Sequence, residues 1–102
     1  MIIYIAGQIT GDPNYRRKFN HAMQAVRELG HTPLTSAVLP AGLTEAAYMR
    51  IILDMIDSAD LVLFLPDYTK SEGATVEWLW CRKTGRAWDF FTRGEAEQEE
   101  AI

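Results

Sequence analysis

The sequence predicts an α/β fold built on a short parallel sheet. Two short runs, over residues 2–6 and 61–65, are continuously apolar, which is typical of strands buried on both faces. The longer segments between strands carry apolar residues at three- and four-residue steps, as amphipathic helices do. Strands and helices alternate along the whole chain. Because crossovers between parallel strands are right-handed, we expect helices on both faces of one sheet.

The first strand leads into a glycine-containing loop over residues 7–13. Asp12 is a suitable N-cap for the following helix, and Pro13 suits its first position. The helix is expected to run to about Leu29, with Gly30 ending it. Its apolar stripe consists of Tyr15, Phe19, Ala22, Met23, Val26 and Leu29.

Residues 31–36 predict a short second strand. Pro33 cannot donate a hydrogen bond to a neighbouring strand, which places this strand at a sheet edge. After a loop over residues 37–43, Thr44 is expected to cap a second long helix. The apolar stripe of that helix consists of Tyr48, Ile51, Ile52, Met55, Ile56 and Ala59.

The third strand, over residues 61–65, leads through a polar loop into a third helix from about Ala74 to Thr84, which Gly85 ends. Residues 86–91 are rich in aromatic side chains, which favours a fourth strand. The two most apolar strands should be central neighbours. We therefore expect the strand order 2-1-3-4, a flavodoxin-like three-layer sandwich.

Ligands of such sheets bind at the carboxyl ends of the strands, where the strand order reverses. Here that point falls between the first and third strands. The loops that leave them, over residues 7–12 and 66–73, should face each other across one cleft. This arrangement also brings Glu77 close to Tyr4 and Gly7.

Length and composition predict one domain over residues 1–92 and an acidic C-terminal tail over residues 93–102. Apolar residues make up 48% of the chain, enough for one core. The formal net charge of -4 argues against a nucleic-acid partner, which a basic face would have to bind. The single cysteine, Cys81, cannot form an internal disulfide, which favours the cytoplasm.

The N-terminal apolar run is short and has no basic leader, so we interpret it as a strand rather than a signal peptide. No run approaches the length that spans a membrane, and no membrane partner is expected. His21, His31 and Cys81 have no partners at metal-ligand spacing, so neither a metal nor a cofactor is expected. Trp78 and Trp80 are two residues apart on one helix. At most one should be core, which leaves the other for a subunit contact or a base.

Glu77 is expected in the first turn of the third helix. It is either an acid that the helix dipole favours there, or a nucleophile or base that the dipole keeps ionised. Tyr4 is either a core tyrosine or a hydroxyl directed at the cleft. Gly7 and Gly11 either form a tight turn or let an anion approach the following helix N-terminus.

Two motifs give the chain a resemblance to a known family. The segments Tyr4-Ile5-Ala6-Gly7-Gln8-Ile9-Thr10-Gly11 and Ser71-x-Gly73-Ala74-x-x-Glu77 resemble those of the nucleoside 2-deoxyribosyltransferase-like superfamily. Within it, the chain is most similar to DUF4406, a family of small phage and bacterial domains, over nearly its whole length to about Phe91. The resemblance implies the flavodoxin-like fold. It also implies cleavage or exchange of the N-glycosidic bond of nucleosides or their 5'-monophosphates.

The resemblance assigns roles to single residues. Glu77 matches the nucleophile, which forms a glycosyl ester that water or a second base resolves, and Tyr4 matches the tyrosine that positions it. Ser71 matches a phosphate-binding serine, and a neutral hydroxyl there favours a 5'-phosphate over a free 5'-hydroxyl. The rest of the expected substrate and phosphate site consists of Gly7, Gln8, Ile9, Thr10, Gly11 and Gly73.

The chain departs from the superfamily at two positions. Ile52 stands where the enzymes usually place an aspartate that assists protonation of the leaving base. Asp54, two residues away, points to a different helix face. Thr10 stands where monophosphate hydrolases tend to place an arginine, which removes a charge-assisted phosphate contact.

The sequence thus predicts a nucleoside or nucleoside 5'-monophosphate N-glycosidase or deoxyribosyltransferase, with a small-molecule substrate and no cofactor. The alternative is a non-catalytic module that binds or senses a nucleotide in the same cleft. A third interpretation is cleavage of another N-ribosyl compound, such as a nicotinamide nucleotide. The family resemblance also implies a homo-oligomer, a dimer or larger, in which a neighbour contributes to the cleft.

Overall fold

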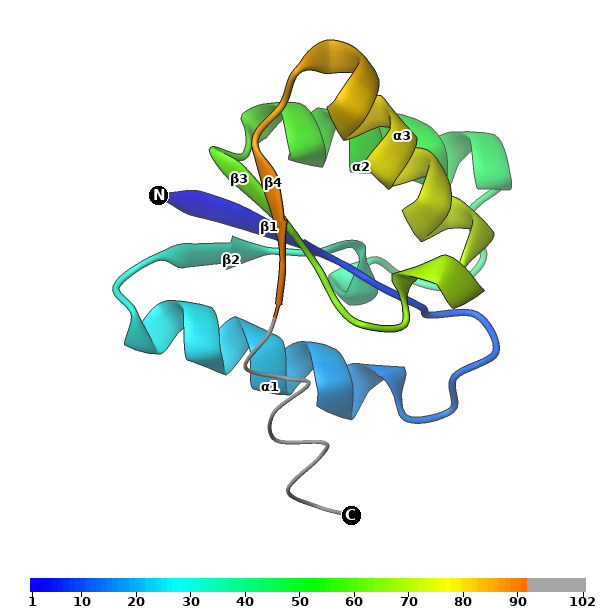
Figure 1. Ribbon diagram of the computed structural model, residues 1–102. Helices are drawn as coiled ribbons and strands as arrows, with labels where there is room; N and C mark the ends of the chain where they lie inside the picture. The colour runs from blue at the N-terminus through cyan, green and yellow to red at the C-terminus, as the bar shows by residue number, and fades with distance from the viewer. Residues whose placement is uncertain (92–102) are drawn as a thin grey trace.

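The computed structural model describes residues 1–91, which form one parallel sheet between two layers of helices (Figure 1). The strands pair in the order β2-β1-β3-β4, as predicted, and every pair is parallel. The strands are β1 (Ile2–Ala6), β2 (Thr32–Leu34), β3 (Leu61–Phe64) and β4 (Trp88–Phe90). The α-helices are α1 (Tyr15–Glu28), α2 (Glu45–Ser58) and α3 (Glu72–Thr84), and two 3-10 turns are η1 (Ser36–Val38) and η2 (Tyr68–Lys70).

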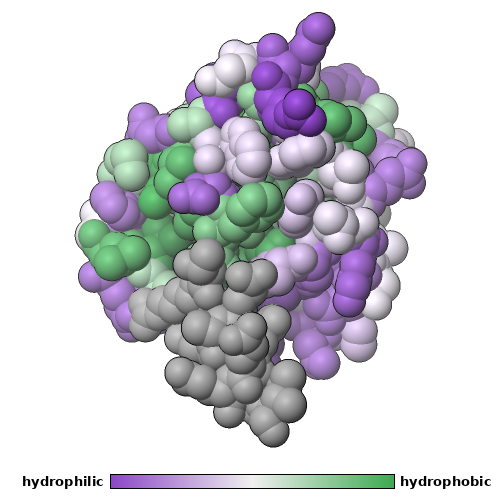
Figure 2. Space-filling model, viewed as in Figure 1, coloured by the Kyte–Doolittle hydropathy of each residue, from purple (hydrophilic) through white to green (hydrophobic). Residues whose placement is uncertain are grey.

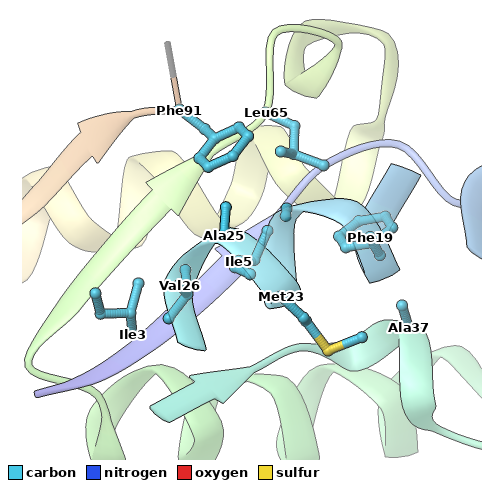
Figure 3. Close-up of a cluster of buried hydrophobic side chains, with 10 residues drawn as sticks. Ile3, Ile5, Phe19, Met23, Ala25, Val26, Ala37, Leu65 and Phe91 are labelled. Atoms are coloured by element: carbon cyan, nitrogen blue, oxygen red, sulfur yellow. The ribbon is translucent and has the colours of Figure 1, made fainter. Parts of the chain in front are cut away.

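The central strand β1 divides the core into two halves. Its successive side chains point to opposite faces of the sheet, so Ile3 and Ile5 face α1 while Tyr4 and Ala6 face α2 and α3. Figure 3 shows the α1 half. The buried members of this half are Ile3, Ile5, Phe19, Ala22, Met23, Ala25, Val26, Ala37, Leu65 and Phe91.

The other half of the core holds Tyr4, Ala6, Ile52, Ile56, Ala59, Val62, Phe64 and Cys81. Trp78 and Trp80 are only partly buried, and both pack against it without belonging to the buried core. The prediction that at most one of them is core is not contradicted, although both rings contact the core. The reason is that α3 has a neighbour on each flank. The Trp78 ring meets Trp88 of β4 edge-on, and the indole N–H of Trp80 donates to the carboxylate of Asp57 in α2.

The two edge strands are shorter than predicted, three residues each in place of six. After β2 the chain turns at once into η1, because the side-chain oxygen of Thr35 accepts the backbone N–H of Ala37 and stabilises the turn. β2 lies at the sheet edge, as Pro33 predicts.

The first helix begins at Tyr15, later than predicted. Asp12 does not cap it; its carboxylate instead accepts the backbone N–H of Asn14 and closes a turn before the helix. The helix ends at Glu28, so Leu29 lies beyond it and is 71% exposed rather than part of the stripe. Ile51 of the second stripe is exposed as well. Thr44 caps α2 as predicted.

The third helix begins at Glu72, two residues earlier than predicted. The Ser71 hydroxyl accepts the backbone N–H of Ala74 at 3.1 Å and forms the N-cap. Glu77 therefore lies in the second turn of α3, not in the first. Gly85, with φ of +73°, ends the helix as predicted.

The predicted acidic tail, residues 93–102, lies outside the described residues. No helix within residues 1–91 is long and apolar enough to cross a membrane. Figure 2 shows apolar side chains gathered at the left and centre of the face seen in Figure 1, with hydrophilic ones mainly along its top and right side. Phe90 of the edge strand β4 is 42% exposed. The expected homo-oligomer stays a prediction.

Phe64 anchors β3 in the core, and its removal should destabilise the fold. Its side chain is fully buried and contacts the rings of Tyr68 and Trp88. We expect Phe64→Ala to lower the free energy of unfolding by about 3–5 kcal/mol, because the cavity cannot collapse fully. The matched control is Phe90→Ala at the exposed edge, with an expected loss of about 1 kcal/mol. Urea titrations of both variants measure the difference, and equal losses would contradict the assigned core.

Candidate functional site

Tyr4 of β1 and Glu77 of α3 meet on the α2–α3 side of the sheet. The Tyr4 hydroxyl donates a hydrogen bond to Oε1 of Glu77 at 3.4 Å, between residues 73 positions apart in the sequence. Tyr4 is fully buried, and Glu77 is only 4% exposed. The two residues that the topology predicts to be close are therefore in contact.

Glu77 is a buried carboxyl group with few partners. Oε2 has no hydrogen-bond partner within the part of the chain that the structure describes. Desolvation raises the pKa of Glu77 to about 8, and the hydrogen bond from Tyr4 only partly opposes this rise. At neutral pH the carboxyl is mostly protonated. The expectation that the helix dipole keeps it ionised is wrong, because the residue lies one turn further along and is buried.

Ser36, the first residue of η1, interacts with Tyr4 and so joins the cluster that Tyr4 and Glu77 form. Burial raises the pKa of Tyr4 well above its usual value, and the charge of Glu77 adds to the rise. Hydrogen bonding from the hydroxyl and backbone N–H of Ser36 acts in the opposite direction. Ser36 was not among the residues predicted for the site. Its position directly after an edge strand, at the carboxyl end of the sheet, is the signal that could have identified it.

The loops that follow β1 and β3 lie side by side (Figure 1) and are joined by hydrogen bonds. The backbone N–H of Gln8 donates to Oδ1 of Asp67 at 3.2 Å. A Cβ atom on Gly7 would lie 2.9 Å from the Leu65 side chain and 3.1 Å from the same Asp67 oxygen. A larger residue at position 7 would force Leu65 and Asp67 to shift, so the close approach of the second loop favours glycine there. This confirms that the two loops face each other.

Lys18 of α1 contacts both the loop after β1 and the loop after β3. Its ammonium group donates to the carbonyl oxygen of Gln8 at 2.7 Å and to Asp12 at 2.8 Å, and it also forms an ion pair with Asp67. The Lys18 side chain is only 14% exposed. The hydrogen bond that Lys18 donates to Asp12 holds the pKa of Asp12 below its usual range. Helical periodicity places Lys18 off the apolar stripe and gives no sign of this role.

The remaining predicted site residues lie around these loops. Thr10 is exposed, and its carbonyl oxygen accepts the side-chain amide of Gln8. Gly11 adopts φ of +88°, a conformation that favours glycine. Ile9 packs against the α1 half of the core, so its side chain is not directed at Glu77. Gly73 lies in the first turn of α3, beside the hydroxyl of the Ser71 cap.

Helix α2 brings an apolar residue to the cluster. Ile52 is buried in the same half of the core as Tyr4, while Asp54 is exposed. Asp54 is therefore not placed to replace the aspartate that the family resemblance leads one to expect at position 52. Within residues 1–91, no group of three or more His, Cys, Asp or Glu side chains could hold a metal ion.

The raised pKa of Glu77 makes the stability of the fold depend on pH. The unfolded chain ionises this group near 4.5, whereas the folded chain does so near 8. The contribution of Glu77 to the free energy of unfolding is therefore fully present below pH 4.5. It is lost as pH rises to 8, by up to about 4 kcal/mol. Glu77→Gln should remove this component. Urea unfolding of the two proteins from pH 4.5 to 9 measures the difference, with Glu72→Gln as the exposed control. Parallel profiles for wild type and Glu77→Gln would contradict the assignment.

The chain matches the model of one known protein family. Residues 1–88 match the family described as a domain of unknown function, DUF4406. No curated protein matches the chain.

Two solved structures share the fold. The 2-deoxyribosyltransferase of Bacillus psychrosaccharolyticus, described as a biocatalyst for nucleoside synthesis, superposes with a TM-score of 0.71 at 20% identity, over 89% of this chain and 72% of that one. The 2-deoxyribosyltransferase of Leishmania mexicana gives 0.71 at 19% identity, over 88% of this chain. The chain spans 63% of the Leishmania protein's length. At these identities the likeness shows the fold. The chain belongs to the DUF4406 family and has the fold of the nucleoside 2-deoxyribosyltransferase-like superfamily.

Proposed function

We propose that the chain cleaves or exchanges the N-glycosidic bond of a nucleoside or nucleoside 5'-monophosphate, with Glu77 as the nucleophile. The observation that carries the proposal is the buried contact between the Tyr4 hydroxyl and the Glu77 carboxyl. A carboxyl group with a strongly raised pKa is unusual in a structural role and common in a functional one. The shared fold with two 2-deoxyribosyltransferases supports this choice of chemistry.

The two carboxyl oxygens have different surroundings and hence different roles. Oε1 accepts the Tyr4 hydroxyl, which fixes the orientation of the group. Oε2, without a hydrogen-bond partner among the described residues, is the atom that attacks the anomeric carbon. The C–N bond breaks as the C–O bond forms, and its electron pair leaves with the base, which then takes up a proton. Water or a second base displaces Glu77 from the ester and regenerates the carboxylate.

The neighbouring residues position this pair and the substrate. Ser36 orients the Tyr4 hydroxyl, which in turn orients Glu77. The loop over residues 7–11 and the start of α3, with Ser71 and Gly73, take the 5' end of the sugar. The Ser71 hydroxyl accepts the backbone N–H of Ala74 and still has its own proton to donate to a ligand.

A non-catalytic module that binds a nucleoside or nucleotide in the same cleft is the second candidate. Two observations favour it. Ile52 supplies no acid for the leaving base, and burial keeps Glu77 largely protonated at neutral pH. A protonated carboxyl can hold a ligand by hydrogen bonding but is a poor nucleophile.

Replacement of Glu77 tests the nucleophile. Incubation with a panel of nucleosides, their 5'-monophosphates and a nicotinamide nucleotide should release free base, detected by chromatography. We expect Glu77→Gln to reduce release by at least about 10³-fold, because no carboxylate remains to form the ester. Glu45→Gln, on the exposed first position of α2, is the matched control and should keep full activity.

The outcomes separate the two candidates. Base release that survives Glu77→Gln would exclude Glu77 as the nucleophile. No release by the wild type, together with tight binding of the same compounds by calorimetry, would favour the binding module.

The pH dependence of base release tests the protonation state. Only the ionised carboxylate attacks, and the free protein ionises Glu77 near pH 8. We expect kcat/KM to rise with pH up to about 8 and then to level off, since this parameter reports the free enzyme. Initial rates at subsaturating substrate from pH 5 to 9 measure the profile. A rate that is already constant above pH 5 would contradict the raised pKa.

A further inference from the structure

The outward surface of α3 carries apolar residues that the core does not use. The buried side of the helix consists of Ala74, Glu77 and Cys81. On the other side, Val76 is 43% exposed and Leu79 is 51% exposed. The exposed residues of α1, by contrast, are all polar or charged: Arg16, Arg17, Asn20, His21, Gln24, Arg27 and Glu28. Two exposed aliphatic residues one turn apart on α3 favour a surface that a partner covers.

Two residues of opposite charge flank this apolar pair. At 100° per residue, roughly 60° of the helix circumference holds a stripe of four residues: Glu72, Val76, Leu79 and Lys83. Glu72 lies in the first turn of α3 and Lys83 in the last, and both are exposed. Neither forms an ion pair with another residue among positions 1–91. Along the helix, this α3 stripe therefore has an acidic end, an apolar centre and a basic end.

The α3 stripe is complementary to a second copy of itself in the antiparallel orientation. In a two-fold symmetric contact, both chains use the same surface. The midpoint between Glu72 and Lys83 is also the midpoint between Val76 and Leu79. With the axis at that midpoint, Val76 meets Leu79 of the partner subunit, and Glu72 meets Lys83 of the partner subunit. The contact then has an apolar centre and an ion pair at each end, whereas a parallel contact would place like charges together.

We propose that the α3 stripe is the contact surface of a homodimer, in which the two copies of α3 pack antiparallel. The stripe lies roughly 130° around the helix from Glu77, so the partner's α3 is not directed at the contact between Tyr4 and Glu77. The contact does not require that the chain be an enzyme. Because one helix face is a small interface, we expect a dissociation constant in the micromolar range.

Sedimentation velocity of the full chain tests the contact. We expect a dimer, with twice the 11.6 kDa mass of the chain, at about 100 µM and a monomer at about 0.1 µM. Leu79→Lys places a charge in the apolar centre twice and should weaken dimerisation by at least about 100-fold. Leu29→Lys, at a residue beyond α1 that is 71% exposed, is the matched control and should leave dimerisation unchanged. Far-UV circular dichroism verifies that each variant is folded.

Exchange of the two charges tests the antiparallel orientation. Glu72→Lys or Lys83→Glu alone places like charges at both ends of the contact, and each should weaken dimerisation by about 10-fold at low salt. A mixture of the two variants has opposite charges at both ends. A fluorescently labelled Glu72→Lys chain should therefore bind the unlabelled Lys83→Glu chain with about the affinity of the wild-type dimer.

Three results would overturn the proposal. The first is a wild type that stays monomeric at about 100 µM. The second is a dimer that Leu79→Lys leaves intact, because the contact would then use another surface. The third is a mixture of the two charge variants that associates no more tightly than either variant alone, which would exclude the antiparallel pairing of Glu72 with Lys83 of the partner subunit.

Discussion

The pairing of β1 with β3 is the constraint on which the rest of the structure depends. The two strands are parallel neighbours, with Tyr4 opposite Val62 and Ala6 opposite Phe64. Parallel neighbours end at the same edge of the sheet, so the loops after them must share one space. The same register sends Tyr4 to the face that α3 covers, where Glu77 lies. A shift of β1 by one residue would turn Tyr4 toward α1 and separate the pair.

The burial of Glu77 is unfavourable for stability and is best understood as a requirement of the site. A carboxyl group removed from water with one long hydrogen bond destabilises the fold as soon as the unfolded chain can ionise it. An apolar residue of similar size would fill this position in α3 without that cost. Residues that destabilise a fold tend to occur at functional sites, where the chemistry requires them. Ile52 is an apolar residue buried in the same half of the core. It illustrates the kind of side chain that could occupy such a position without the cost of burying a carboxyl group.

Periodicity and turn chemistry predicted the parts of the structure that burial controls. The strand order, the edge position of β2 and the approach of Tyr4 to Glu77 all follow from where apolar residues stand. The start of α3 did not follow, since the Ser71 cap is a local hydrogen bond that hydrophobic spacing does not report. The prediction for Leu29 was wrong for the converse reason. Leu29 continues the apolar stripe in the sequence, but the helix has already ended at Glu28. The contact of Ser36 with Tyr4 and the ion pair of Lys18 with Asp67 depend on the conformation of loops. The spacing of apolar residues does not predict that conformation.

Asp67 and Glu77 have opposite environments, and the environment of Glu77 matters for the proposed chemistry. Asp67 forms an ion pair with Lys18, whereas Glu77 lies in an apolar setting that raises its pKa to about 8. In N-glycosidic cleavage, positive charge develops on the sugar as the base departs. A carboxylate in a water-poor site attracts that charge far more strongly than one in water. In the proposed reaction the Glu77 carboxylate is therefore least stable as an anion in the empty protein and most stabilised beside the developing cation, and this differential interaction lowers the barrier.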